Sequence, residues 1–178
     1  MKDTTLAIRY AKAYLELARE RDDMDRAVEG AEKALAFLEN QPEALSVLMS
    51  PLMPFKKKAE AIGQAMGKDV PSEAKKLAVF VIEKGRATYL PEILRQVKAL
   101  YEDLRGIRHA EVTSAVPLTD AQVEELVRRL KEATAASEII LKRDVDQGLI
   151  GGVRVKIGDR VWDASVSGRL EELKKKYL

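Results

Sequence analysis

The chain has 178 residues, of which 46% are hydrophobic, 34% charged and 5% aromatic, which predicts one medium or two small folded domains with aliphatic cores. It contains no cysteine, so disulfides and thiolate metal sites are excluded. The first ten residues hold no long apolar run, and no window approaches the about 20 apolar residues of a membrane span, so neither a signal peptide nor a transmembrane helix is expected.

The first part of the sequence, residues 1–105, shows apolar positions at helical spacing throughout. Prolines and glycines separate the apolar stripes, as they do at helix boundaries. The expected helices cover approximately residues 4–20, 23–39, 42–49, 54–66, 71–84 and 91–105. Amphipathic helices joined by such short links favour a compact six-helix bundle.

After Gly106 the apolar period changes from 3.6 to 2, which is typical of strands. A strand is expected at 109–116, a helix after Thr119, further strands at 138–145, 153–157 and 161–164, and a last helix from about Val166. Gly158 precedes Asp159 as a hairpin turn. The fold class is therefore mainly α, with an N-terminal six-helix bundle (1–105) followed by a small α+β C-terminal domain (106–178).

Residues that could perform catalysis are scattered. His109 is the only histidine and falls on the polar side of its expected strand, so it is interpreted as a surface residue. The glycines at 148, 151 and 152 lead into a strand without a following Lys-Ser/Thr, so they form neither a phosphate loop nor a dinucleotide fingerprint. We expect no enzymatic activity, no cofactor and no metal.

Charge gives little support to nucleic-acid binding. Residues 1–105 carry 18 Lys/Arg against 17 Asp/Glu, and residues 106–178 carry 13 against 12. A nucleic-acid-binding domain usually has a basic excess. The run Lys56-Lys57-Lys58, or the strand with Arg154 and Lys156, keeps that class open as an alternative, and an unrelated helical adaptor is a second one.

Two of the expected helices have more apolar surface than one stripe needs. The first is apolar nearly all round, and the fifth carries Val79 and Phe80 away from its stripe of Leu77 and Val81. Such helices are either central in a bundle or contact both a core and a partner. The pattern leaves both interpretations open.

Three segments resemble the delta subunits of F-type ATP synthases, the bacterial counterparts of the oligomycin-sensitivity-conferring protein. They are 9–18 (RYAKAYLELA), 83–94 with EKGR and LPEIL, and 149–173 (LIGGVRVKIGDRVWDASVSGRLEEL). The third is the most specific, because over a long run it matches the positions of the glycines, the alternation of apolar and polar residues and the start of a helix. The resemblance covers the whole chain in length and element order.

The resemblance implies a non-catalytic stator subunit, present in one copy per complex. Residues 1–105 would bind the N-terminal helix of an alpha subunit, and residues 106–178 the C-terminal end of the b-subunit stalk. Together they would link the catalytic head to the peripheral stalk and couple proton flow to ATP synthesis. It further implies a peripheral location on the cytoplasmic side of the cell membrane, with membrane contact only through the complex.

By the same resemblance, the alpha-subunit helix would lie between the first and fifth helices. Tyr10 and Tyr14 are one turn apart on the first helix, and Lys76 and Phe80 are one turn apart on the fifth, so each pair shares a face. Aromatic rings facing outward would form the receptor, unless the two tyrosines belong to the core. The remaining candidate residues are Gly151, Gly152 and Gly158, which we expect to shape the backbone.

Overall fold

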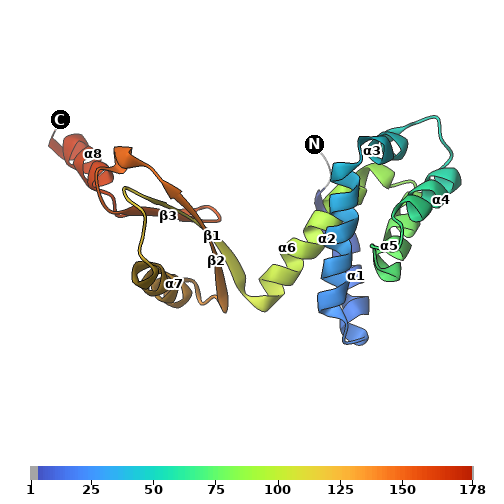
Figure 1. Ribbon diagram of the computed structural model, residues 1–178, viewed down its shortest axis with the longest axis horizontal. Coiled ribbons are helices and arrows are strands. Elements are labelled where there is room, and N and C mark those ends of the chain that lie inside the picture. Colours follow the sequence, from blue (N-terminus) through green and yellow to red (C-terminus); the bar gives the residue numbers. More distant parts are fainter. Residues whose placement is uncertain (1–3, 178) are drawn as a thin grey trace. The chain divides into compact units, whose positions relative to one another are not determined.

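The computed structural model describes residues 4–177 and is mainly helical, with a small four-stranded sheet in its C-terminal part (Figure 1). The chain divides between Tyr101 and Glu102 into two compact units, each with its own hydrophobic core. Among the described residues, no helix is long and apolar enough to span a membrane.

Helices form nearly all of the first unit. They are α1 (Thr4–Glu20), α2 (Met24–Asn40), α3 (Pro42–Met49), α4 (Phe55–Ala65), α5 (Ser72–Glu83), the short 3-10 helix η1 (Ala87–Tyr89) and α6 (Leu90–Arg105). These bounds agree with the sequence prediction to within one or two residues. Gly85 has a φ of +73°, a conformation that suits glycine and ends α5 where the sequence predicted.

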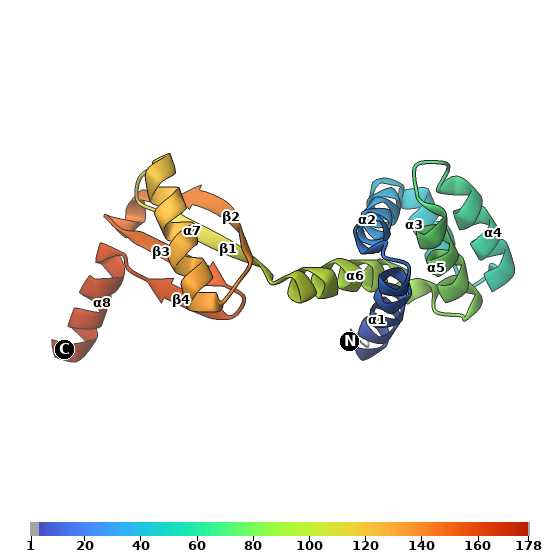
Figure 2. The same cartoon turned by 90° about the horizontal axis from the view of Figure 1, so that it is seen from below.

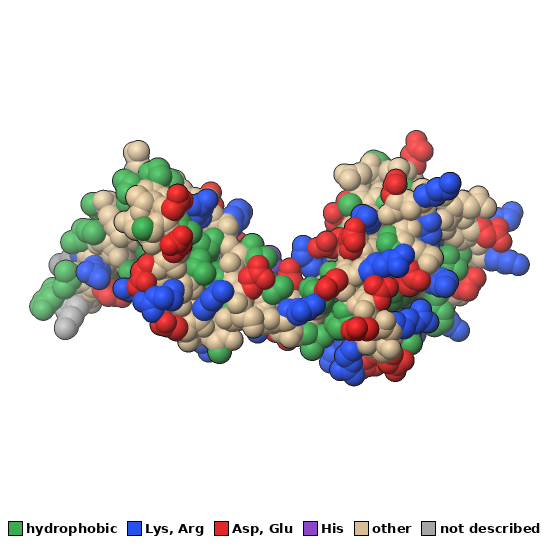
Figure 3. Space-filling view, turned by 60° about the horizontal axis from the view of Figure 1, so that its bottom comes forward, with side chains coloured by type: hydrophobic (Ala, Val, Ile, Leu, Met, Phe, Trp, Pro, Cys, Tyr) green, Lys and Arg blue, Asp and Glu red, His purple; other side chains and the backbone are tan. Residues whose placement is uncertain are grey.

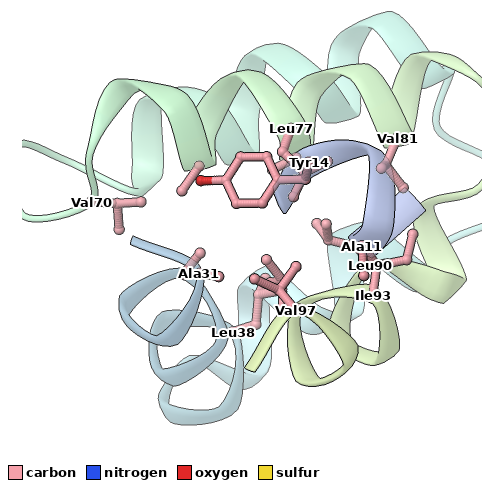
Figure 4. Close-up of a cluster of buried hydrophobic side chains, with 14 of the residues drawn as sticks. Ala11, Tyr14, Ala31, Leu38, Val70, Leu77, Val81, Leu90, Ile93 and Val97 are labelled. Carbon is pink, nitrogen blue, oxygen red and sulfur yellow. The ribbon is translucent and has the colours of Figure 1, made fainter. Parts of the chain in front are cut away.

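The core of the first unit is aliphatic, as the composition predicted. Helix α1 buries Ala7, Ala11, Tyr14, Leu15 and Ala18, and its alanines allow neighbouring backbones to approach closely. In Figure 4, the ring of Tyr14 lies in the same buried cluster as side chains from α2, α5 and α6. Because this cluster draws on so many helices, the helices hold one another in place.

The second unit is built around the sheet. Its elements are β1 (Ile107–Ser114), α7 (Asp120–Thr134), β2 (Glu138–Val145), the 3-10 helix η2 (Gln147–Leu149), β3 (Val153–Ile157), β4 (Arg160–Asp163) and α8 (Val166–Tyr177). The strand order is β2-β1-β3-β4, with β1 parallel to β2 and antiparallel to β3. Helix α7 connects the two parallel strands and lies against the sheet (Figure 2).

Among residues 4–177, helix α7 covers one face of the sheet and the other face is left open. Val112 and Val155 are paired across β1 and β3, and with Leu130 of α7 they form part of a small core. On the opposite face, Lys156 pairs with Glu111 at 3.8 Å, and Ile140 and Val161 are exposed. This one-sided burial is typical of a small α+β unit.

One strand prediction was wrong at its end. The alternation predicted β1 over 109–116 with Val116 on the apolar side. The strand ends at Ser114, Ala115 is buried and Val116 is 67% exposed. The Ser114 hydroxyl donates a hydrogen bond to the Val116 carbonyl at 2.8 Å, so the chain turns before Pro117. By contrast, the predicted cap at Thr119 is confirmed, because Thr119 and Gln122 form a reciprocal capping box.

Candidate functional site

An apolar groove of about 340 Å³ opens on the first unit between α1, α5 and the beginning of α2. Its lining is mainly aliphatic and aromatic, with charged side chains among them. The lining residues are Tyr10, Ala13, Tyr14, Leu17, Ala18, Arg21, Asp23, Arg26, Ala27, Glu73, Lys76, Leu77 and Phe80. All four residues that the sequence proposed for partner binding are therefore brought together here.

The aromatic pair Tyr10 and Phe80 connects α1 to α5. Their ring centroids lie 6.2 Å apart. Each ring also has a cation nearby: the Arg86 guanidinium lies 5.3 Å from the Tyr10 centroid, and the Lys84 ammonium lies 5.4 Å from that of Phe80. Arg86 also donates a hydrogen bond to the Tyr10 hydroxyl. Phe80 is 48% exposed, so its ring is available to a partner.

Tyr14 differs from the expectation that its ring faces outward. Only 8% of the residue is exposed, and its hydroxyl donates a hydrogen bond to the Ala27 carbonyl at 3.2 Å. Burial, followed by the charges of Glu73 and Asp23, raises the pKa of Tyr14 to about 12. The ring fills the space between α1, α2 and α5, so Tyr14 is a core residue that also forms part of the groove wall.

Sequence reasoning missed two parts of this groove. Leu17 and Ala13 were not among the residues proposed for partner binding, but both are exposed and line the groove. Their spacing from Tyr10 and Tyr14 (three residues in each case) would have placed them on the same face. Arg26 and Ala27 of α2 also line the groove, and nothing in the sequence pattern indicated that they would.

The charges of the groove have mixed sign. Arg21, Arg26 and Lys76 lie beside Asp23 and Glu73. Hydrogen bonds from its own backbone amide and from Ser72, and then the charges of Arg26 and Lys76, lower the pKa of Glu73. Its Oε2 atom is buried and has no hydrogen-bond partner among the described residues, so a bound polar group could pair with it.

The glycine-rich turn before β3 fixes how α8 leaves the sheet. Gly152 has a φ of +78°, and a Cβ there would lie 2.3 Å from the Ala164 carbonyl oxygen. At Gly151 a Cβ would lie 3.1 Å from Val166, whose amide donates to the Gly151 carbonyl at 2.9 Å. Gly158 has a φ of +56° in the hairpin between β3 and β4.

The start of α8 is organised by one carboxylate. Asp163 Oδ1 accepts hydrogen bonds from the Ser165 amide and hydroxyl, and Oδ2 accepts one from Arg154 at 2.8 Å. The Ser165 hydroxyl oxygen in turn accepts from the Gly168 amide at 3.0 Å. The bonds from Ser165 and then Arg154 lower the pKa of Asp163 to about 2. These contacts explain why Asp163, Ser165 and Gly168 occur in the C-terminal motif, the segment 149–173 that resembles the delta subunits.

Comparison with known proteins decides the family. The sequence model of the family described as ATP synthase delta (OSCP) subunit matches residues 6–177 of this chain. The chain belongs to the ATP synthase delta (OSCP) subunit family. It is 34% identical to ATP synthase subunit delta of Syntrophomonas wolfei, over 98% of this chain and 95% of the relative. It is 35% identical to that of Heliobacterium modesticaldum, over 97% and 93%.

The fold agrees with this family. A chain in the cryo-EM structure of the Toxoplasma gondii mitochondrial ATP synthase hexamer superposes with a TM-score of 0.66, at 18% identity and over 97% of both chains. ATP synthase subunit delta of Chlorobaculum parvum is 34% identical over 100% of this chain and 98% of the relative. The resemblance to the delta subunit family that the sequence motifs indicated is therefore confirmed.

Three of the five basic residues behind the nucleic-acid alternative are engaged within this delta-family chain, whereas Lys56 and Lys57 are exposed. Lys58 is buried and its ammonium donates to the Leu48 carbonyl at 3.0 Å. Arg154 pairs with Asp163, and Lys156 pairs with a glutamate. Figure 3 shows basic and acidic side chains intermingled over the visible surface of each unit. His109 is exposed beside Glu102, at 3.0 Å, as a surface residue.

Proposed function

We propose that this chain is the non-catalytic stator connector of an F-type ATP synthase, linking the catalytic head to the peripheral stalk. Family membership over nearly the whole chain carries this proposal. In this role residues 1–105 act as a six-helix bundle that holds the head, and residues 106–178 act as an α+β domain that holds the stalk. Proton flow can then be coupled to ATP synthesis, because the head does not turn with the rotor.

The partner of the first domain is the N-terminal amphipathic helix of an alpha subunit. The groove supports this assignment because its walls are apolar and aromatic, and such walls accept the apolar face of a helix. Phe80 offers an exposed ring, and Tyr10 combines an apolar ring with a hydroxyl held by Arg86. Lys76 and Arg26 at the groove can pair with acidic groups of the same helix.

The partner of the second domain is the C-terminal end of the b-subunit stalk. Support comes from the C-terminal motif, whose glycines and Asp163 fix the start of α8 against the sheet. One copy of the chain serves each complex. It lies on the cytoplasmic side of the membrane and reaches the membrane only through the other subunits.

A connector needs affinity and stiffness at two contacts. The buried alanine-rich contacts of α1 with its neighbours make the first domain resistant to deformation, since tightly packed cores transmit load. The short turn at Gly152 allows little freedom between the sheet and α8. Neither property requires catalysis, and the chain adds no chemistry to the ATP synthase.

A three-component binding experiment tests the function. Heads stripped of their delta subunit are mixed with immobilised b-subunit stalk, with and without this chain. We expect the heads to be retained only when the chain is present. A fragment of residues 1–105 should unfold cooperatively and bind the heads without retaining them on the stalk. Retention of heads without the chain, or no retention with it, would contradict the proposal.

A further inference from the structure

The groove between α1 and α5 has two ends that differ in their residues. Tyr10, in the first half of α1, packs against Phe80 in the last turn of α5. Tyr14 lies one turn later in α1, and the charge of Glu73, in the first turn of α5, acts on it. The two helices therefore run in opposite directions along the groove. A long molecule bound there has one end beside Phe80 and the other beside Glu73.

The two ends also differ in charge. At the Phe80 end, the Lys84 ammonium lies 5.4 Å from the centroid of the Phe80 ring, and the Arg86 guanidinium lies 5.3 Å from that of Tyr10. Among the described residues that line the groove, the carboxylates are those of Asp23 and Glu73. Both act on Tyr14 and so belong to the opposite end.

Glu73 keeps one acceptor atom unpaired. Its carboxylate receives hydrogen bonds from its own backbone amide and from Ser72. The other oxygen, Oε2, is buried and has no hydrogen-bond partner within residues 4–177. A buried acceptor without a donor is unfavourable, and most such atoms in folded proteins are paired. Because Glu73 lines the groove, rotation of its carboxylate can present an oxygen to a donor bound there.

The cations near Glu73 leave this acceptor unpaired. Arg26 and Lys76 act on Glu73 through their charge, without a hydrogen bond to it. Arg26 also lies 4.0 Å from Asp23, so its charge is shared between two carboxylates. The negative charge of Glu73 is therefore partly balanced while its oxygen still lacks a donor. A donor with a partial positive charge, such as a free amide at the start of a helix, fits this situation.

We infer that the groove binds an amphipathic helix in one direction, with its first turn beside Glu73 and its last turn beside Lys84 and Arg86. The first amides of a helix lack partners within it and carry partial positive charge, and its last carbonyls carry partial negative charge. In this direction the amides meet the unpaired oxygen and the carbonyls meet two cations. The reverse direction would place carbonyls against Glu73. The inference rests on the proposed function only in taking a helix as the occupant.

Spin labels test the direction with the full chain. A designed amphipathic helix of 14 residues is about 21 Å long, so a nitroxide at one end affects only nearby amides strongly. We expect a label at the N-terminus to broaden the amide NMR signals of residues 22–27 and 72–74, and a label at the C-terminus to broaden those of 80–86. The opposite pattern, equal broadening by both labels, or broadening by neither would overturn the inference.

A double-mutant cycle tests the role of Glu73. The same helix is prepared with a free and with an acetylated N-terminus, and both are titrated against wild type and Glu73→Gln. Removing the terminal charge should weaken binding to wild type by about two- to fivefold more than binding to Glu73→Gln, because the cycle cancels any change in helix content. Glu83→Gln is the matched control, since Glu83 lies on the same helix, is exposed and does not line the groove. It should behave as wild type. Equal effects in wild type and Glu73→Gln would overturn the role of Glu73.

An alpha-subunit N-terminal peptide distinguishes this inference from the proposed function. If that peptide binds the groove with its N-terminal label beside residues 80–86, the function stands and the inferred direction fails. If the designed helix binds in the inferred direction but the alpha-subunit peptide does not bind, the direction stands and the alpha-subunit assignment fails.

Discussion

The rings of Tyr10 and Phe80 lie 6.2 Å apart and are tilted by 47°. This contact joins two helices that are far apart in sequence, and tilted pairs at this distance are favourable. Since Arg86 and Lys84 lie over the same two rings, the end of the groove has both apolar and cationic character. A helix bound there would meet a preformed aromatic wall.

Replacing Phe80 should affect binding more than folding. Phe80→Ala should weaken binding of an alpha-subunit N-terminal peptide by about 2–4 kcal/mol, as for a hot-spot aromatic. The melting temperature should change little, because the ring is 48% exposed. Isothermal titration calorimetry and thermal melts measure the two effects.

Phe55→Ala is the matched control for this prediction. Phe55 lies on α4, does not line the groove and is 49% exposed. Its removal should leave peptide affinity unchanged. If Phe80→Ala strongly destabilises the protein while peptide binding per folded molecule stays the same, Phe80 belongs to the core and the binding site lies elsewhere.

Tyr14→Phe should act on stability. The change removes the hydrogen bond to the Ala27 carbonyl and should lower the free energy of unfolding by about 1 kcal/mol. Peptide affinity should fall much less than for Phe80→Ala, since the buried ring remains. Urea denaturation at neutral pH measures the loss, and an unchanged midpoint would show that the bond contributes nothing.

The same tyrosine should leave a signature at high pH. Its pKa is raised from 10.0 to about 12, so the unfolded state ionises first. The stability that protonated Tyr14 provides should be complete below pH 10 and disappear as the pH rises through 12. The difference in unfolding free energy between wild type and Tyr14→Phe should therefore shrink or reverse over this interval.

Gly152→Val should disrupt the second unit. A Cβ at this position would collide with the Ala164 carbonyl, and a β-branched residue disfavours positive φ, so we expect a loss of about 3 kcal/mol or more. Gly158→Ala is the control: its φ is also positive, nothing lies within 4 Å, and about 1 kcal/mol should be lost. Loss of stalk binding by Gly152→Val with a native circular dichroism spectrum would refute a purely structural role.

Acid should weaken the start of α8 through Asp163. Its pKa is lowered from 3.8 to about 2, so its stabilisation is present above pH 4 and is lost as the pH falls towards 2. Asp163→Asn should remove this part of the acid dependence. Melting temperatures of wild type and variant between pH 2 and 5 measure it, and parallel curves would contradict the assignment.

Helix and strand positions were largely predictable because proline, glycine and apolar spacing act locally. Gly85, for example, ends α5 and Thr119 caps α7, and both effects depend only on the residue itself and its close neighbours in sequence. The end of β1 was not predictable, because the Ser114 side chain bonds to a carbonyl two residues later and breaks the alternation.

The groove was predictable only in part. Phe80 stands outside the stripe of its helix, which correctly indicated exposure. Tyr14 could not be distinguished from Tyr10 by helical position, since the distinction depends on how closely α2 approaches and offers the Ala27 carbonyl. Approach of one helix to another is set by the packing of the whole unit, and a single helix pattern does not encode it.

The buried ammonium of Lys58 has a practical consequence. Its residue is 4% exposed and bonded to Leu48 near the end of α3, whereas its neighbours Lys56 and Lys57 are exposed. An amine-acylating reagent should therefore modify those two at once and reach Lys58 only when α3 and α4 separate. Mass spectrometry of this one lysine would time the opening of the first unit, within the assembled enzyme as well as in the isolated chain.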